Sequence, residues 1–180
     1  MTTVGAKEGD LVELVSPEGE AAGVATVAQA HQVPGRLHRA FSVLLVDPAG
    51  RLLLQQRAAG KTRFPLRWAN ACCGHPAPGE AVADAARRRL AEEIGVRDVA
   101  LTELGVYVYR AEDPATGRVE HEFDHVLVGR VGEDLALTPD PAEVAALRWV
   151  TIPKLSAALA DEPDSYAPWL PGVVALLPQD

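Results

Sequence analysis

Cysteine is scarce in this chain of 180 residues, and the two cysteines that occur, Cys72 and Cys73, are neighbours. Adjacent residues rarely adopt the geometry that a disulfide demands, so the sequence predicts two free thiols. The chain also lacks an apolar run near the ~20 residues that span a bilayer, and it lacks a secretory signal pattern. We therefore expect a cytoplasmic protein that does not enter a membrane.

Positive charge is also limited, and it is not gathered into blocks. The chain has 17 Lys and Arg against 25 Asp and Glu, which gives a formal net charge of -8. Binding of nucleic acids is driven mainly by neutralising phosphates, so we expect no nucleic-acid partner. A small phosphorylated molecule is still compatible, because salt screens charges beyond roughly 8 Å and a local cation cluster can hold a diphosphate.

The length suits one domain, which we assign to residues 1–180 with residues 1–9 as a frayed tail. Short runs of strand-forming residues, bounded by turn residues, predict several strands. These strands are 11–15, 24–27, 40–46, 52–56, 105–109 and 122–128. The first two are expected to form an N-terminal hairpin, and the last two flank a polar loop over 113–117.

Apolar residues at helical spacing predict a helix over 79–93, in which Ala85, Ala86 and Leu90 recur on one face. Gly95 provides its stop, since glycine commonly ends helices. Two further helical segments, 153–160 and 169–177, close the chain. With no internal repeat and no linker, strands and helices are expected to share one core.

Two carboxylates stand out in the strand-like segment near residue 120. Glu120 and Glu122 are two residues apart, so both face the same side of a strand and favour a cation. His121 and His125 alternate onto the opposite face, and we predict a structural role for them. A solvated strand face is the alternative interpretation of the two glutamates.

Three of the five histidines lie beside turn residues or at the entrance to a strand: His31, His38 and His75. A single histidine is more often a hydrogen-bonded structural residue than a ligand. Together with the two glutamates, however, three imidazoles form a plausible site for a divalent transition metal such as Mn²⁺ or Zn²⁺.

The predicted helix and the turn before it carry a pattern that resembles the Nudix box. The matching positions are Gly74, Glu80, Arg88, Leu90, Glu92, Glu93, Gly95 and Val96. One position departs from the box, because Arg89 stands where a glutamate is usual. The resemblance implies that clustered acids bind metals for hydrolysis, so this cation argues against phosphate cleavage and for gripping a diphosphate. Ordinary surface pairing, as between Arg88 and Glu92, is the alternative.

Three further segments make the resemblance more specific: His31 to Ser42, Asn70 to Pro76, and Val119 to Glu122. In order and approximate spacing they resemble the type 1 isopentenyl-diphosphate isomerase family, a Nudix-fold branch that moves a double bond. The resemblance implies an α+β fold, a Nudix-type α/β/α sandwich with a mixed sheet and an N-terminal β-hairpin extension. It also implies a small prenyl diphosphate as substrate.

The implied chemistry is a proton transfer that interconverts isopentenyl and dimethylallyl diphosphate in isoprenoid biosynthesis. The resemblance implies Cys73 and Glu122 as the acid/base pair, with Tyr109 assisting Glu122. Trp169 matches a tryptophan that faces the carbocation, and a role as a core residue is the alternative.

The remaining implied roles concern metals and the diphosphate. The implied ligands of the transition metal are His31, His38, His75, Glu120 and Glu122. The implied magnesium ligand beside the diphosphate is Glu93. The implied diphosphate contacts are Arg57, Lys61 and Arg89, for which solvent-exposed charge is the alternative.

Two positions depart from the family pattern. Val27 occupies a place where relatives commonly have a phosphate-binding lysine, and Leu66-Arg67 replaces a more usual Gly-x before Trp68. A weaker diphosphate grip, a cation relocated to Arg67 or Arg36, and a different prenyl substrate are each compatible with the loss of the lysine.

Two other functions stay open. One is a Nudix pyrophosphohydrolase that cleaves a nucleoside diphosphate derivative, and the other is a non-catalytic prenyl-diphosphate sensor. We expect a monomer or a weak dimer in each case.

Overall fold

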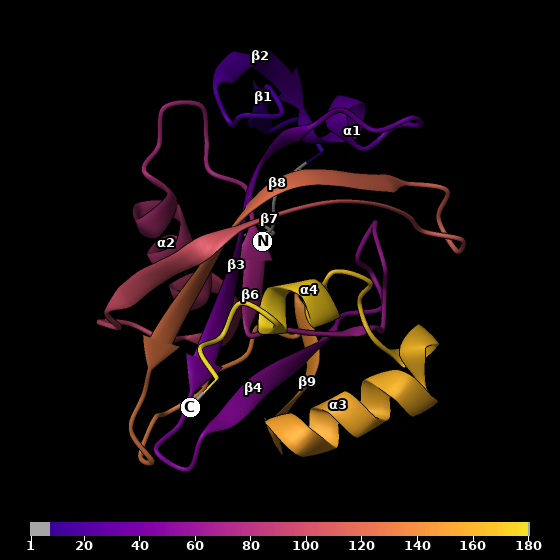
Figure 1. Cartoon of the computed structure of the whole chain (residues 1–180). Coiled ribbons are helices and arrows are strands. Elements are labelled where there is room, and N and C mark those ends of the chain that lie inside the picture. The colour runs from indigo at the N-terminus through magenta and orange to yellow at the C-terminus, as the bar shows by residue number, and fades with distance from the viewer. Residues whose placement is uncertain (1–7, 180) are drawn as a thin grey trace.

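A computed structural model describes residues 8–179 of the chain, which form nine strands, four α-helices and one short 3₁₀-helix (Figure 1). The strands are β1 (Leu11–Val15), β2 (Ala21–Thr26), β3 (His38–Val46), β4 (Arg51–Arg57), β5 (Trp68–Ala69), β6 (Cys72–Gly74), β7 (Leu101–Glu112), β8 (Val119–Arg130) and β9 (Val144–Thr151). The helices are α1 (Val27–Ala30), α2 (Val82–Ile94), α3 (Ile152–Asp161), η1 (Pro163–Ser165) and α4 (Leu170–Val174). Within these residues, no helix is both long and apolar enough to cross a bilayer.

Strand β3 is the centre of a mixed sheet. It pairs in parallel with β8, starting at His38 opposite Glu122, and antiparallel with β6, where Ser42 lies opposite Cys73. Strand β7 extends the sheet beyond β8, and β9 pairs with β4. The strands that carry the candidate acid/base pair therefore both lie next to β3.

Side chains of β3 alternate between two cores. Phe41, Val43 and Leu45 pack in a cluster with α2, whereas Leu44 and Val46 pack in a second cluster with residues of α3 and α4. Figure 1 shows α2 on one side of the sheet and the two C-terminal helices on the other. The predicted α/β/α sandwich is confirmed.

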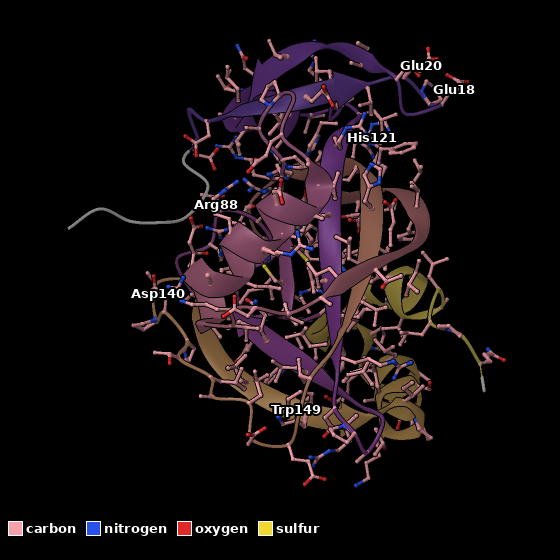
Figure 2. All side chains as sticks on the ribbon, turned by 90° about the vertical axis from the view of Figure 1, so that its left-hand side faces the viewer. Glu18, Glu20, Arg88, His121, Asp140 and Trp149 are labelled. Carbon is pink, nitrogen blue, oxygen red and sulfur yellow. The ribbon has the colours of Figure 1, made fainter. Side chains whose placement is uncertain are left out.

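The N-terminal hairpin has a small core of its own. Its buried members are Val12, Leu14, Ala25, Val27 and Ala30. Strand β1 joins the main sheet through Leu14, which lies opposite His38 on β3. Figure 2 shows Glu18 and Glu20 at the outer tip of this hairpin, so the predicted hairpin extension is also confirmed.

The prediction that the second strand includes Val27 is wrong, because this residue begins helix α1. Thr26 caps the helix: its hydroxyl accepts a hydrogen bond from the Gln29 backbone at 3.2 Å, and the Gln29 side chain accepts one from the Thr26 backbone at 3.0 Å. This reciprocal capping box satisfies two backbone donors and turns the chain out of the strand.

The predicted helix over 79–93 starts later than expected. Gly79 has a φ of 79° and Ala81 is extended, so helical geometry begins at Val82. The predicted stop is confirmed, because Gly95 is left-handed with a φ of 73°. Helix α4 is also shorter than the predicted 169–177, since the backbone after Val174 continues in turns bonded three residues apart.

We predict that Gly95→Ala lowers the free energy of unfolding by about 1 to 3 kcal/mol. A Cβ at this position would lie 2.9 Å from the Cβ of Thr138, in addition to the cost of the left-handed backbone. Gly50→Ala is the matched control, because Gly50 has a similar φ of 75° with nothing within 4 Å of its added Cβ. Urea unfolding should give the larger loss for Gly95→Ala, and equal losses would contradict the proposed contact.

Candidate active site

A cavity of about 880 Å³ opens between the hairpin, the strands around β3 and the end of α2. Its walls bring together most of the site residues predicted from sequence. Those lining it are Arg57, Lys61, Cys73, His75, Arg89, Glu93, Tyr109, Glu120, Glu122 and Trp169. The remaining two, His31 and His38, are fully buried and lie in contact range of His75.

Five side chains converge in a candidate metal site at one end of this cavity. Each offers one ligand atom, and these atoms all lie within 4.8 Å of one another. The residues are His31, His38, His75, Glu120 and Glu122. Four structural elements supply them: the end of α1, the start of β3, the turn after β6, and alternate positions of β8.

Two of these histidines are oriented by backbone carbonyls. The Nδ1 atom of His31 lies 2.6 Å from the Val27 carbonyl oxygen, and the Nδ1 atom of His38 lies 2.8 Å from that of Arg36. A carbonyl only accepts hydrogen bonds, so Nδ1 carries the proton and Nε2 presents its lone pair to the cluster. Within the described residues, Nε2 of His38 is buried and has no hydrogen-bond partner. This arrangement fits a metal ligand.

The electrostatics of the cluster also suit a cation. Burial, with a smaller contribution from His31, lowers the pKa of His38 to about 4, and burial likewise lowers the pKa of His75 well below its usual range. Burial raises the pKa of Glu122, and the neighbouring Glu120 raises it further. Neutral imidazoles and buried carboxylates are the donors that bind divalent transition metals, so the residues present fit such an ion.

Cys73 lies on β6, across β3 from the strand that carries Glu120 and Glu122. Its Sγ is 3.3 Å from Oδ1 of Asn70 and 3.6 Å from the Ser42 hydroxyl. Burial, followed by the charge of Asp124, raises the pKa of the Cys73 thiol to about 12. The sulfur therefore keeps its proton at neutral pH in the protein alone.

Asn70 has a positioning role that we did not assign from the sequence. Its amide donates to the carbonyls of Val43 and Cys72 at 3.1 and 2.8 Å, which fixes the orientation of the group. Its Oδ1 then accepts from the Cys73 thiol and, at 3.1 Å, from the indole of Trp169. The available signal in the sequence was a polar amide between Ala69 and Ala71, and its complete burial is seen only in the structure.

Two aromatic side chains line the cavity near these groups. Trp169 is only 2% exposed, and its ring centroid lies 6.0 Å from that of Tyr109. Tyr109 stands opposite Glu122 in the β7–β8 register, and burial and Glu122 raise the pKa of its phenol. The phenol is therefore a hydrogen-bond donor beside the metal cluster.

Cations and carboxylates alternate at the α2 end of the cavity. Arg89 pairs with Glu92 at 2.8 Å and also with Glu93, and Lys61 lies 3.9 Å from Glu93 and pairs with Glu143. Burial lowers the pKa of Lys61 to about 8. These groups are largely buried, so the interpretation of Lys61 and Arg89 as solvent-exposed charge is wrong.

The exposed part of α2 carries the surface pairing considered above. Arg88 contacts Glu80 at 3.1 Å and Glu92 at 3.7 Å. Figure 2 shows Arg88 on this helix, on the side of the molecule that faces the viewer.

Arg57 has a different position from the other two predicted diphosphate contacts. Its guanidinium donates to the carbonyls of Arg63 and Phe64 at 2.8 to 3.1 Å, and it lies 5.5 Å from the ring of Trp169. Arg57 therefore stabilises the β4–β5 loop and contacts the ring of Trp169.

The two cations that we predicted as replacements for the lysine missing at position 27 lie outside the cavity. Arg67 donates to the carbonyl of Tyr166 at 3.3 Å, Arg36 is exposed, and neither is among the described residues that line the cavity. Arg63 does line it, and we did not single it out from the sequence. Leu66 has a φ of 62°, a left-handed conformation that favours the glycine of the family pattern.

The other two histidines lie outside the cluster. His121 contacts the Gly35 carbonyl at 3.3 Å, whereas His125 contacts Glu103 at 2.6 Å and Arg39 at 2.8 Å. These contacts agree with the structural role that we predicted for them.

We predict that His75→Gln lowers the affinity for Mn²⁺ by at least about tenfold, because the variant loses a candidate ligand. Titration calorimetry on metal-stripped protein measures this change. His125→Gln removes a histidine outside the cluster and should bind Mn²⁺ as the wild type does. Equal affinity in the His75 variant would show that the cluster does not hold the ion.

We predict that Asp124→Asn makes the stability of the metal-stripped protein less dependent on pH. Burial raises the pKa of Asp124 from 3.8 to about 8, so its contribution to stability is complete below the unfolded pKa and is lost as pH rises toward the folded one. An amide has no proton to lose. Relative to wild type, the variant should gain unfolding free energy as pH rises through this window, and Asp134→Asn, at an exposed position, should not.

The comparisons with known proteins agree with this geometry. A family model described as the NUDIX domain matches residues 36–172. A Nocardia farcinica protein named isopentenyl-diphosphate Delta-isomerase is 64% identical over 165 residues, covering 92% of this chain and 93% of that protein. A Streptomyces coelicolor protein of the same name is 49% identical over 165 residues, covering 92% of this chain and 82% of that protein.

Solved structures support the same fold. A crystal structure from Deinococcus radiodurans matches with a TM-score of 0.75 at 20% identity, covering 94% of this chain and 100% of that one. At this identity the likeness shows the fold alone. The matched domain and the two sequence relatives show the family. The chain belongs to the Nudix domain family and, within it, to the isopentenyl-diphosphate Delta-isomerases.

Proposed function

We propose that this chain interconverts isopentenyl diphosphate and dimethylallyl diphosphate by moving one double bond. One observation carries the proposal: Cys73 on β6 and Glu122 on β8 flank β3 and line the same cavity. Moving a double bond through a cation requires one group that gives a proton and another that takes one. The register puts Cys73 opposite Ser42 and Glu122 opposite His38, which lie on the same face of β3, so both side chains can face one substrate in the cavity.

In the forward direction, Glu122 gives its proton to the terminal alkene carbon, which leaves a tertiary carbocation. Cys73 then takes a proton from the carbon on the other side of the cation, and the electrons of that C–H bond form the new double bond. One proton enters the substrate and one leaves it, so the reaction balances. The reverse direction exchanges the two roles, with the thiol as acid.

This scheme requires that only one of the two groups carries a proton when the substrate is bound, so that one acts as the acid and the other as the base. Burial raises the pKa of both Cys73 and Glu122, which favours the protonated form of each in the protein alone. A divalent ion held by the His/Glu cluster, which we propose to be Mn²⁺ or Zn²⁺, would supply positive charge that lowers these pKa values. The charge of Arg57 adds positive potential near the sulfur.

We propose that Trp169 stabilises the carbocation intermediate and that Tyr109 assists Glu122. An indole face attracts a cation by about 0.5 to 2 kcal/mol, which is a modest contribution to the rate. The bond from Trp169 to Asn70 holds the ring on the same side as Cys73, and the protonated phenol of Tyr109 supports the glutamate.

The α2 end of the cavity is proposed to bind the diphosphate. Lys61 and Arg89 supply cations there, and Glu93 is the proposed ligand of a magnesium ion that accompanies the substrate. In the protein alone, Glu93 accepts hydrogen bonds from Arg89 and from Gln55. A bound magnesium ion would take the place of Arg89 as the cation beside Glu93, and phosphate oxygens would take the place of Glu93 as the anion beside Arg89.

Arg89 also argues against the alternative of a pyrophosphohydrolase. Its guanidinium occupies a box position that is usually a carboxylate, and it pairs with both Glu92 and Glu93. Fewer acids are then available to gather metals around an attacking water.

Other properties follow from the sequence and stay predictions. We propose a single domain over residues 1–180, a monomer or weak dimer, and no nucleic-acid partner. Of the predicted frayed tail over 1–9, residues 1–7 lie outside the described residues, and Glu8 and Gly9 form a turn. Both cysteines are free thiols and Cys72 is buried, which is compatible with the reducing cytoplasm.

We predict that Cys73→Ala and Glu122→Gln each lower turnover of isopentenyl diphosphate by about 10²- to 10⁴-fold, the usual contribution of a positioned acid or base. Product analysis and deuterium uptake from heavy water measure this loss. Cys72→Ala is the matched control, because its sulfur lies in the core on the α2 side and should leave deuterium uptake near the wild-type level.

The same assay distinguishes the alternatives. Deuterium uptake that survives Cys73→Ala would contradict the proposed chemistry. Release of a monophosphate from nucleoside diphosphate derivatives, abolished by Glu92→Gln or Glu93→Gln, would identify a hydrolase. Stabilisation by a prenyl diphosphate without turnover in the wild type would identify a sensor.

A further inference from the structure

The β4–β5 loop, residues 58–67, carries a buried cation that the proposed function has not used. Arg63 lines the cavity, and its side chain is only 9% exposed. Few proteins bury a guanidinium without a specific partner, because removing its charge from water is costly. The partners of the Arg63 guanidinium therefore indicate what it can bind.

Two carboxylates and one hydroxyl hold Arg63. Its Nε donates to Glu120 at 3.2 Å, and its Nη1 donates to Glu8 at 3.1 Å and to the hydroxyl of Thr62 at 2.9 Å. Glu120 is buried, whereas the Glu8 side chain is 35% exposed. The partner at the outer end of the guanidinium is thus the one that can leave.

Glu8 also connects Arg63 to the site of the missing lysine. The backbone carbonyl of Glu8 accepts a hydrogen bond from the Ala28 backbone at 2.9 Å, so this residue lies against the first turn of α1. Val27, at the start of that turn, lines the same cavity as Arg63. The guanidinium therefore reaches the side of the cavity that a lysine at position 27 would supply with positive charge.

The backbone of Arg63 is held firmly. Its carbonyl accepts two hydrogen bonds from Arg57, and the next residue, Phe64, donates its backbone N–H to Asp113 at 2.8 Å. The side chain starts from a fixed point, which reduces the conformational entropy lost when it grips a ligand.

We propose that Arg63 binds the diphosphate of the substrate in place of the lysine that is absent at position 27, and that Glu8 occupies this cation until the substrate enters. The inference rests on the proposed function. A phosphate oxygen and the Glu8 carboxylate both accept from Nη1, so the substrate exchanges one anion for another. The arrangement keeps a buried cation paired in both states.

We predict that Arg63→Ala raises the KM for isopentenyl diphosphate on the order of tenfold or more, the usual effect of losing a charge-assisted hydrogen bond, with a smaller effect on kcat. Arg63→Lys should be intermediate, because it keeps the charge and loses the planar fork. Glu8→Gln should lower KM, because the competing carboxylate is removed. The control Arg87→Ala removes an exposed cation from α2 and should leave KM unchanged.

A second variant tests the location of the charge. Val27→Lys in the Arg63→Ala background should recover most of the lost affinity, since it restores a cation on the same side of the cavity. Titration calorimetry with inorganic pyrophosphate and magnesium should follow the same order without requiring turnover. Metal content of each variant should be measured in parallel.

Unchanged KM and unchanged pyrophosphate affinity in Arg63→Ala would overturn the inference. Loss of the cluster metal with unchanged pyrophosphate affinity would also overturn it, because Arg63 would then only support Glu120. If the wild type binds pyrophosphate through Arg63 but does not isomerise the substrate, the proposed function fails while Arg63 remains a diphosphate-binding residue.

Discussion

The parallel pairing of β3 with β8 is the constraint on which the rest of the site depends. Its register places His38 opposite Glu122, and period-two alternation then turns Glu120, Glu122 and Asp124 to the same face. A slip of one residue would turn every one of these carboxylates toward the α2 core. The other edge of β3 fixes Cys73 opposite Ser42, so one strand determines the geometry of both halves of the candidate acid/base pair.

The features predictable from sequence were those carried by local patterns. Gly95 ended a helix as expected, since a left-handed stop depends on a few neighbouring residues, and the hairpin and the sandwich follow from strand spacing and the Nudix resemblance. The start of α1 at Val27 was missed because its β-branched neighbours resemble a strand, although the Thr26 and Gln29 capping box was visible. The late start of α2 was missed because Gly79 can adopt either helical or left-handed conformations.

The sequence predicted which residues form the site, but it predicted few of the contacts between them. The five candidate ligands came from strand alternation, from the placement of three histidines and from the family resemblance. Their convergence required the β3–β8 register, which no local pattern encodes. Arg63 and Asn70 illustrate what is lost without coordinates. An arginine in a loop with other charges gives no local sign of burial, and its pairing with Glu8 spans 55 positions of sequence. The absence of the lysine at position 27 was visible in the sequence, whereas Arg63, on the same side of the cavity, was not.

The short helix α1 links the N-terminal hairpin to the candidate metal site. The carbonyl of Val27 orients the imidazole of His31, and this turn belongs to the small hairpin core, which joins the main sheet through a short β1–β3 contact. Elements with small separate cores open locally more easily than the whole protein unfolds. Local opening of the hairpin would therefore release the His31 imidazole from its orientation, and an ion held by the cluster would lose one ligand without unfolding of the main sheet.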